Sequence, residues 1–199
     1  RAEDVQETRR VQPFNLAAVA TEVVRDFVPR ALAKGLDLGY EGPGANEPNA
    51  PRVVGEALLV RELIRNLTDN AVQYTPGGGT VTVRLLPDPY GQVVVLQVED
   101  NGPGIAQAER ELVFQPFYRA LGTNVYGSSL GLAIVREIAL QHDATVLLED
   151  ANLRVRPGLN EHAGAAFGPG ARFTLRFAAM PAEAAAAAEA TAAQTFGAG

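Results

Sequence analysis

The chain of 199 residues contains no cysteine, which excludes disulfide bonds, thiol catalysis and cysteine-based metal sites. It contains one lysine, Lys34, and its other basic residues are arginines. A phosphate-binding site in this chain must therefore use arginine side chains, backbone N–H groups or a metal ion. The chain also shows no signal-peptide pattern and no apolar run of the roughly 18 residues that a membrane span requires. We therefore expect no membrane contact by these residues.

Positive charge is also in short supply, because 17 lysine and arginine residues face 23 acidic ones and the formal net charge is −6. This balance argues against a broad nucleic-acid-binding surface. Hydrophobic residues make up 47% of the chain, which is enough for a sizeable core, and the length suits one domain with appendages. The chain begins with Arg1 and not with methionine, so we expect it to be a fragment of a longer protein.

The segment 62–76, ELIRNLTDNAVQYTP, is the one around which we organise the chain. It is predicted to continue a helix that begins near Glu56, because apolar residues recur at intervals of three and four. These apolar residues are Leu59, Val60, Leu63, Ile64, Leu67 and Ala71. Four others are predicted to lie on the opposite, solvated side: Arg61, Arg65, Thr68 and Asp69.

Two asparagines interrupt this pattern. Asn66 and Asn70 lie one turn apart at the edge of the apolar face, and Gln73 and Tyr74 continue the same strip. Asparagine is a poor helix former, because its side chain competes for backbone hydrogen bonds. Either both amides are satisfied by neighbouring backbone, or the strip lines a ligand cleft and offers amide oxygens to a hard cation.

The segment before this helix predicts another helix and two short strands. Asn15 is the expected N-cap of a helix that ends at Gly35, and Pro29 is expected to kink or shorten it. The apolar face of that helix is predicted to comprise Leu16, Val19, Val23, Phe27 and Leu32. Strands are expected at residues 36–41 and 52–55, on either side of a loop rich in glycine and proline.

The helix that carries Asn66 and Asn70 is called the asparagine helix below. The segment after it predicts a sheet. Residues 80–86 and 92–99 are rich in β-branched side chains and indicate an antiparallel hairpin. Further along we expect a short helix at 106–114, a mobile loop at 117–129, a helix at 130–142 followed by Asp143 in the left-handed conformation, and strands at 145–149 and 172–177. This order predicts an α+β fold, a two-layer sandwich with helices on one face of a mixed, mostly antiparallel sheet.

Three other segments could carry chemistry. Asp100-Asn101-Gly102-Pro103-Gly104-Ile105 places a carboxylate at a strand end before a glycine turn, where it could accept a hydrogen bond from an exocyclic amine or form a plain turn. Gly127-Ser128-Ser129-Leu130-Gly131-Leu132 opens a helix, as either an anion site or an ordinary capped start. Val113-Phe114-Gln115-Pro116-Phe117-Tyr118-Arg119 is an aromatic cluster, typical of a core, with an arginine that could reach phosphate.

These segments, in this order and at these spacings, resemble the N, G1, F and G2 boxes of sensor histidine kinases, members of the GHKL ATP-binding superfamily. The resemblance covers roughly residues 14–177, the expected catalytic ATP-binding domain. Residues 1–13 are then a linker or the end of a preceding dimerisation helix, and 178–199 an Ala-rich tail that we expect to be disordered. The resemblance implies a Bergerat-type fold with a flexible ATP lid at about 118–130.

The resemblance also implies roles for individual residues. Asn70 is the expected Mg2+ ligand, with Asn66 close to the metal and phosphates, and Asp100 is expected to hold the adenine amine. Asn66, Asn70 and Arg119 are the expected catalytic residues. The expected ATP-binding residues are Asn66, Asn70, Gln73, Tyr74, Asp100, Gly102, Gly104, Ile105, Tyr118, Arg119, Gly127, Ser129, Leu130, Gly131, Leu132 and Thr174.

The implied reaction is transfer of the ATP γ-phosphoryl group to a histidine on a separate dimerisation domain, upstream of Arg1, for relay to a response regulator receiver domain. The parent is expected to be a homodimer in the bacterial inner membrane, with this domain in the cytoplasm. Neither His142, a predicted helix cap, nor His162, predicted to be solvated, is expected to be the phosphoacceptor.

The sequence departs from the family pattern at a few positions, and two alternatives to a histidine kinase are considered. Ser129 stands where a glycine is usual, and a left-handed conformation there costs roughly 1–2 kcal/mol, so the chain could be a weakened or non-catalytic nucleotide-binding module. Gln73 replaces a frequent basic residue. The other alternative is a GHKL-type ATPase, but the general-base position one turn before Asn70 holds Asn66, and Glu62 lies a further turn away.

Overall fold

The computed structural model describes residues 11–118, 130–152, 167–181, 184–185 and 187. The helices are α1 (Leu16–Lys34), α2 (Ala57–Tyr74) and α3 (Gly131–Gln141), with two short 3-10 helices, η1 (Gln107–Glu109) and η2 (Leu112–Phe114). The strands are β1 (Gln12–Asn15), β2 (Asp37–Glu41), β3 (Arg52–Gly55), β4 (Thr80–Pro87), β5 (Val93–Asp100), β6 (Val146–Asp150) and β7 (Ala171–Met180).

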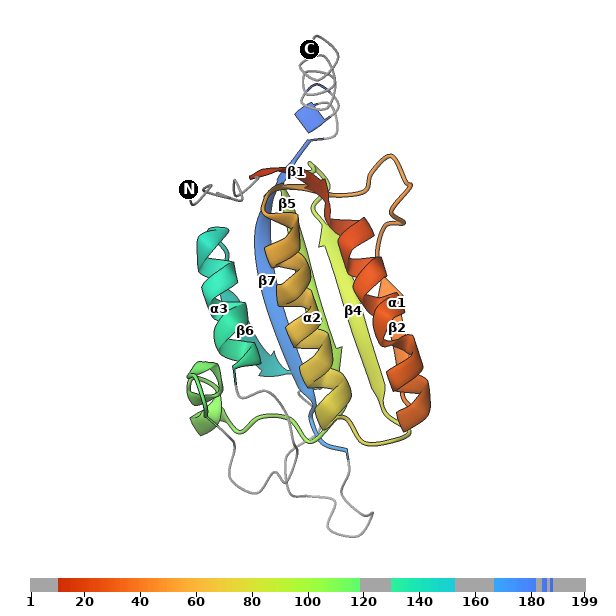
Figure 1. The fold of residues 1–199 in the computed structure, drawn as a ribbon, viewed down its shortest axis with the longest axis vertical. Coiled ribbons are helices and arrows are strands. Elements are labelled where there is room, and N and C mark those ends of the chain that lie inside the picture. Colours follow the sequence, from red (N-terminus) through yellow and green to blue (C-terminus); the bar gives the residue numbers. More distant parts are fainter. Residues whose placement is uncertain (1–10, 119–129, 153–166, 182–183, 186, 188–199) are drawn as a thin grey trace, which may run out of the picture.

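The strands described form one sheet in the order β1-β3-β7-β5-β4-β2, and β6 pairs with the first half of β7. Only β2 and β4 run parallel; the other pairs among the described residues are antiparallel. The three α-helices lie side by side on one face of this sheet (Figure 1). The predicted α+β two-layer architecture and the predicted hairpin of β4 and β5 are confirmed.

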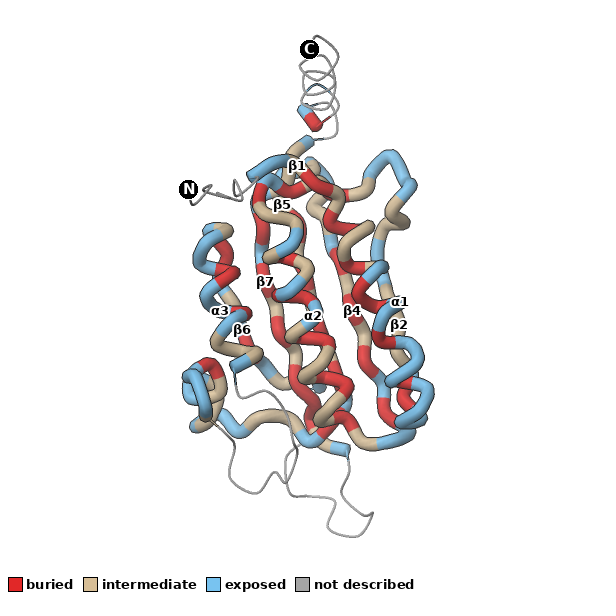
Figure 2. The backbone as a smooth tube through the Cα atoms, viewed as in Figure 1, coloured by how far each residue is buried: buried red, intermediate tan, exposed pale blue. Residues whose placement is uncertain are grey.

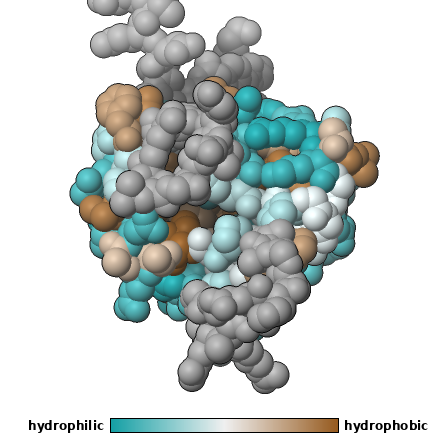
Figure 3. Space-filling model, turned by 90° about the horizontal axis from the view of Figure 1, so that it is seen from below, coloured by the Kyte–Doolittle hydropathy of each residue, from teal (hydrophilic) through white to brown (hydrophobic). Residues whose placement is uncertain are grey.

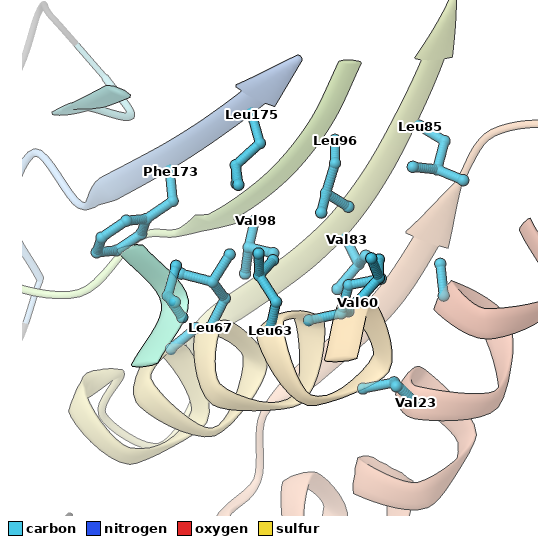
Figure 4. Packing of buried hydrophobic residues seen from close by; sticks show 14 of the residues in the cluster. Val23, Val60, Leu63, Leu67, Val83, Leu85, Leu96, Val98, Phe173 and Leu175 are labelled. Atoms are coloured by element: carbon cyan, nitrogen blue, oxygen red, sulfur yellow. The ribbon is translucent and has the colours of Figure 1, made fainter. Parts of the chain in front are cut away.

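The core lies between α2 and the three central strands. Alternate residues of β4, β5 and β7 point at the helices, because successive side chains of a strand face opposite sides of a sheet. On the helix side the side chains are Val60, Leu63, Ile64 and Leu67; on the strand side they are Val81, Val83, Leu85, Val94, Leu96, Val98, Phe173, Leu175 and Phe177. Figure 2 shows the buried positions on both facing surfaces, and Figure 4 shows the side chains meeting between them.

The ends of α1 follow the sequence, but its middle differs from the expectation. As predicted, Asn15 caps the helix, accepting a hydrogen bond from the Ala18 N–H at 3.0 Å, and the helix ends at Gly35. Gly35 adopts the left-handed conformation. Pro29 does not shorten the helix, which continues to Lys34. Leu32 is 70% exposed and does not belong to the apolar face. In the turn after Phe27, the apolar face of α1 is continued instead by Ala31, which is buried.

Two further segments differ from the expectation: the one after the glycine turn and the one at the C-terminal end of the sheet. Residues 106–114 form η1 and η2 in place of one helix, and each ends with a hydrogen bond across three residues. The last strand continues to Met180, so residues 178–180 belong to the sheet and not to the tail. They extend the strand because Ala178 pairs with Val93, and Ala179 and Met180 pair with β3.

Two further positions test the helix pattern. Thr68 was predicted on the solvated side of α2 but is fully buried, and its hydroxyl donates to the Ile64 carbonyl at 2.8 Å. Its polar group is therefore satisfied inside its own helix. After α3, Asp143 adopts the predicted left-handed conformation, with φ of 53°.

Candidate functional site

The asparagine strip of α2 faces the beginning of α3. A small pocket between the two helices is lined by Asn66, Asp69, Asn70, Gln73, Tyr74, Gly131 and Leu132. This pocket lies at the end of the molecule where α2 finishes, and on this end hydrophobic and hydrophilic side chains lie side by side (Figure 3). A mixed surface of this kind suits a ligand that has both apolar and charged parts.

The two asparagines have different surroundings. The Asn66 amide nitrogen donates to the Glu62 carbonyl at 2.8 Å and to the Glu62 carboxylate at 3.0 Å. Its oxygen lies against Gly131, where an added Cβ atom would be only 2.9 Å away. No hydrogen bond of the Asn70 side chain occurs within the described residues. Asn66 therefore fits both interpretations of the strip, satisfied amide and cleft wall, whereas Asn70 has amide atoms available to a ligand.

Asp100 ends β5 with its side chain buried on the helix side of the sheet. Its Oδ1 atom accepts hydrogen bonds from the Gly102 N–H at 2.9 Å and the Ala171 N–H at 3.3 Å. Burial raises the pKa of Asp100 to about 6, against the lowering effect of these two bonds. Within the described residues Oδ2 has no donor. The carboxylate can therefore accept one more hydrogen bond from a ligand.

The glycines after Asp100 serve close packing within the protein. Gly104 has φ of 81°, and a Cβ atom there would lie 2.9 Å from Pro169 Cγ and 3.0 Å from the Gly170 carbonyl oxygen. The Gly168 and Gly170 N–H groups both donate to the Gly102 carbonyl, at 2.9 and 3.0 Å. The resemblance implied that these glycines let a base approach closely. The contacts here show in addition that they let two backbone turns meet behind Asp100.

The aromatic cluster is divided between core and surface. Phe114 is buried, lies edge-to-face with Phe173 at 6.2 Å between ring centroids, and has the Arg136 guanidinium 5.5 Å above its ring. Phe117 is 74% exposed in a left-handed conformation, with φ of 65°. The Tyr118 hydroxyl donates to Glu109 at 3.0 Å. Only Phe114 therefore behaves as the core residue that its spacing predicts.

The remaining predicted residues fall into three groups. Ile105 and Leu132 pack against the core, and Leu130 is 38% exposed before the first turn of α3. Arg119, Gly127, Ser129 and His162 lie outside the described residues. The prediction for Thr174 is wrong, because its hydroxyl bonds with Gln97 at 3.3 Å on the face of the sheet opposite the core residues Phe173 and Leu175. At the Asp100 end of β7 the residue in contact is Ala171.

The structure adds two residues that the sequence interpretation did not place in or near the site. Lys34 donates to the carbonyls of Val72 and Gln73 in the last turn of α2. Ala171, the first residue of β7, supplies the second N–H to Asp100. A signal existed for Lys34, since it is the only lysine in the chain and precedes the helix-ending Gly35.

His142 lies at the other ends of the same two helices. Its Nδ1–H donates to the Ile138 carbonyl at 2.8 Å, and its Nε2 accepts from the Glu56 N–H at 3.1 Å, directly before α2. This arrangement agrees with the predicted capping role and leaves both ring nitrogens occupied.

The described side chains do not by themselves form a complete binding site for a divalent cation. The described residues contain no group of three or more His, Asp or Glu side chains that could hold a metal ion. Mg2+ prefers oxygen ligands and commonly keeps water and phosphate oxygens in its shell while taking one or two from the protein. The Asn70 amide oxygen is suited to that role.

Among the described residues, no helix is both long and apolar enough to cross a membrane.

Comparison with known proteins gives the class to which this arrangement belongs. The family model described as "Histidine kinase-, DNA gyrase B-, and HSP90-like ATPase" matches residues 55–180. The chain therefore belongs to this ATPase family. The match includes the asparagine helix, the glycine turn after Asp100, α3 and the whole of β7.

Individual relatives are sensor kinases. Over 135 residues the chain is 36% identical to the sensor protein kinase PmrB of Pseudomonas aeruginosa, covering 67% of this chain and 27% of that protein. It is 45% identical over 101 residues to the histidine-protein kinase/phosphatase MprB of a Mycobacterium species, covering 50% of this chain and 19% of that protein. The chain thus spans a fifth to a quarter of the length of these relatives.

Solved structures of histidine kinases share the fold of this chain. The mycobacterial sensor histidine kinase MprB superposes with a TM-score of 0.69 and 27% identity, over 86% of this chain and 99% of that one. The catalytic domain of the histidine kinase ThkA gives a TM-score of 0.67 at 22% identity, over 86% of this chain and 99% of that one, and supports the fold alone. The expectation of a histidine kinase catalytic domain of the GHKL class is confirmed.

Proposed function

We propose that this chain transfers the γ-phosphoryl group of ATP to a histidine on a separate dimerisation domain of a two-component sensor kinase. The observation that carries the proposal is the pocket between the last turns of α2 and the first turn of α3, with Asn70 on its wall. The N-terminus of a helix that follows a loop favours phosphate binding. An amide oxygen opposite that N-terminus suits the metal ion that accompanies phosphate. The family membership of residues 55–180 supports ATP as the nucleotide.

In this proposal Asp100 accepts the adenine amine through Oδ2, and Tyr74 and Ile105 lie near the base. Asn70 holds Mg2+, which when bound neutralises charge on the transferring phosphoryl group. The N–H groups at the start of α3, around Leu130 and Gly131, face the phosphates. Arg119, Gly127 and Ser129, which lie outside the described residues, complete the phosphate side in the sequence-based assignment.

The partners follow from the same proposal. The phosphoacceptor histidine belongs to a dimerisation domain that precedes this one, and the phosphoryl group passes from it to a response regulator receiver domain. ThkA, a structural neighbour at 23% identity, has been solved in complex with a response regulator. We place the parent protein in the bacterial membrane as a homodimer, with this domain on the cytoplasmic side.

The test is titration of the chain with Mg2+-ATP. Wild type should bind in the micromolar to millimolar range, and Asn70→Ala should abolish binding, because it removes the proposed metal ligand. Asn46→Ala, in the loop before β3, is the matched control and should bind like wild type. With a separately supplied acceptor domain, wild type should form phosphohistidine and Asn70→Ala should not. Absence of wild-type binding even at millimolar ATP would reject the proposal.

One alternative, ATP hydrolysis with Glu62 as general base, has a distinct signature. The Glu62 carboxylate is exposed and hydrogen bonded to the Asn66 amide, and it lies two turns before Asn70. Substantial ATPase activity that disappears in Glu62→Gln, without transfer to an acceptor domain, would favour hydrolysis. The other alternative, a weakened nucleotide-binding module, predicts that Ser129→Gly increases Mg2+-ATP affinity and that phosphotransfer is negligible until that change is made.

A further inference from the structure

The C-terminal end of α2 is capped by a side chain from another helix. The last four carbonyls of an α-helix have no partner within the helix. The Thr75 N–H and hydroxyl both donate to the Ala71 carbonyl, at 3.0 and 2.6 Å. The next two carbonyls, of Val72 and Gln73, accept from the Lys34 ammonium at 2.8 and 2.6 Å. There is no basic residue in the last turn of α2 itself, so Lys34 brings the cation that a helix C-terminus favours.

Lys34 is itself held at a fixed place by the turn that follows α2. Gly35 ends α1 in the left-handed conformation, and its carbonyl accepts from the Gly78 N–H at 2.8 Å. The Asp37 N–H donates to the Gly79 carbonyl at 2.9 Å. A Cβ atom on Gly77 would approach the Lys34 carbonyl oxygen to 2.9 Å. The ends of α1 and α2 are thus joined by backbone contacts at the residues that directly follow the lysine.

The capped turn is the one that carries the candidate site. Asn70, Gln73 and Tyr74 line the pocket against α3, whereas Lys34 is not among its lining residues. The Lys34 ammonium therefore affects the site indirectly, by holding the last turn of α2 in a fixed orientation. Partial burial and the neighbouring Arg30 lower the pKa of Lys34, so the two carbonyl bonds hold a cation against an opposing electrostatic cost.

We propose that Lys34 is a positioning residue of the nucleotide site, which holds the last turn of α2 so that Asn70 faces the first turn of α3. The inference rests on the proposed function, because it assigns Lys34 a task in that site. A displacement of about 1 Å in a catalytic group is enough to lower activity severely. The contact is made by a residue 38 positions away from Val72 in the chain.

The experiment compares Lys34→Met, Lys34→Arg and Arg61→Met for Mg2+-ATP affinity, with unfolding curves for all three. Lys34→Met keeps the aliphatic stem but cannot donate, and should weaken affinity about tenfold. Lys34→Arg keeps donors and charge and should recover most of it. Arg61→Met removes the exposed Arg61–Asp26 ion pair between the same two helices and should change affinity by less than about twofold.

A second readout separates positioning from general stability. In Lys34→Met, the NMR signal of the Asn70 side-chain amide should move, and in Arg61→Met it should stay. Because Lys34 is the only lysine, acetylation of folded wild type with an amine-reactive ester reproduces the loss of charge without a mutation, with the N-terminal amine as the other product. Bound Mg2+-ATP should slow acetylation of Lys34 and leave that of the N-terminal amine unchanged.

The outcomes separate the two proposals. Unchanged Mg2+-ATP affinity in Lys34→Met, with wild type binding normally, would overturn the role of Lys34 and leave the proposed function intact. Weakened affinity with an unmoved Asn70 signal would also overturn it. If Lys34→Met does not fold, the acetylated wild type decides by the same two criteria. If wild type itself does not bind Mg2+-ATP, both proposals fail together.

Discussion

Asp100 combines a structural cost with a proposed binding role. Its pKa is raised from the ordinary 3.8 to about 6, mainly because the carboxylate is buried. A folded-state pKa above that of the unfolded chain means that protonation stabilises the folded state. The cost of the ionised carboxylate is therefore absent below pH of about 4, grows as the pH rises from 4 to 6, and is complete above 6. A difference of this size corresponds to about 3 kcal/mol.

We therefore expect Asp100→Asn to make the chain more stable and less able to bind nucleotide. At pH 7.5 its free energy of unfolding should exceed that of wild type by about 1–3 kcal/mol, and urea titrations at several pH values should show the difference closing as the pH falls towards 4. Mg2+-ATP affinity should fall about 10- to 100-fold, because an amide N–H replaces the acceptor. A less stable Asp100→Asn variant with normal affinity would contradict this account.

Asp88→Asn is the matched control for the charge change. Asp88 is an exposed carboxylate in the β4–β5 turn that accepts from the Gln92 and Val93 N–H groups, at 2.7 and 2.9 Å. These bonds lower its pKa, the opposite direction from Asp100. Its stabilising effect is therefore present at neutral pH and is lost as the pH falls through its pKa. Asp88→Asn should not stabilise the chain and should leave nucleotide affinity unchanged.

At the scale of elements, α2 and α3 are joined at one end by His142. The ring accepts a hydrogen bond from the Glu56 N–H and donates one to the Ile138 carbonyl. The Glu56 side chain itself makes no capping hydrogen bond to α2. It is also packed closely, since a Cβ atom on Gly55 would lie 2.4 Å from His142 Cδ2. One side chain therefore fixes where α2 begins relative to where α3 ends.

Replacement of His142 by alanine should destabilise the chain by about 1–3 kcal/mol, the cost of leaving a donor unpaired. Gln141→Ala is the control, because Gln141 is exposed and its amide bonds with Glu137 in the same helix. That variant should stay within about 0.5 kcal/mol of wild type. Urea unfolding of both variants measures the difference. Equal unfolding midpoints would show that the His142 contacts do not hold the helices together.

The elements differ in how far the sequence could predict them. The asparagine helix could be predicted because its apolar repeat is a local pattern. The β4–β5 hairpin could be predicted because its two β-branched segments are neighbours in the chain. The strand β1 was missed because its four residues gain strand geometry only by pairing with β3. Lys34 could not be connected to Val72 and Gln73 for the same reason, since the contact depends on how two helices pack.

Individual side chains show the same limit. Thr68 was misplaced because helical spacing alone does not reveal that its hydroxyl can be satisfied by the Ile64 carbonyl. The Thr174 error was avoidable, because the alternation of β7 places it opposite Phe173 and Leu175. The order of Asn66, Asn70 and Asp100 carried the site prediction, since motif spacing is read directly from the chain.

At the scale of the whole molecule, β7 joins every part of the sheet. It pairs with β5 along most of its length, with β6 over residues 171–175, and with β3 at its C-terminal end. The pair of strands β1 and β3 is attached to the rest of the sheet through two residue pairs, Arg52 with Met180 and Val53 with Ala179. Because β3 leads directly into α2, these last residues of β7 also help to place the asparagine helix.

A pair of truncations tests this arrangement. A chain ending at residue 177 lacks the residues that pair with β3 and should lose about 2 kcal/mol of stability or more, from the backbone hydrogen bonds of that attachment. A chain ending at residue 187 keeps β7 and removes only the end of the Ala-rich segment, which offers little to bury, and should stay within about 0.5 kcal/mol of the full chain. Urea unfolding of the three chains provides the measurement. If the two truncations unfold at the same urea concentration, the attachment of β1 and β3 does not depend on the end of β7.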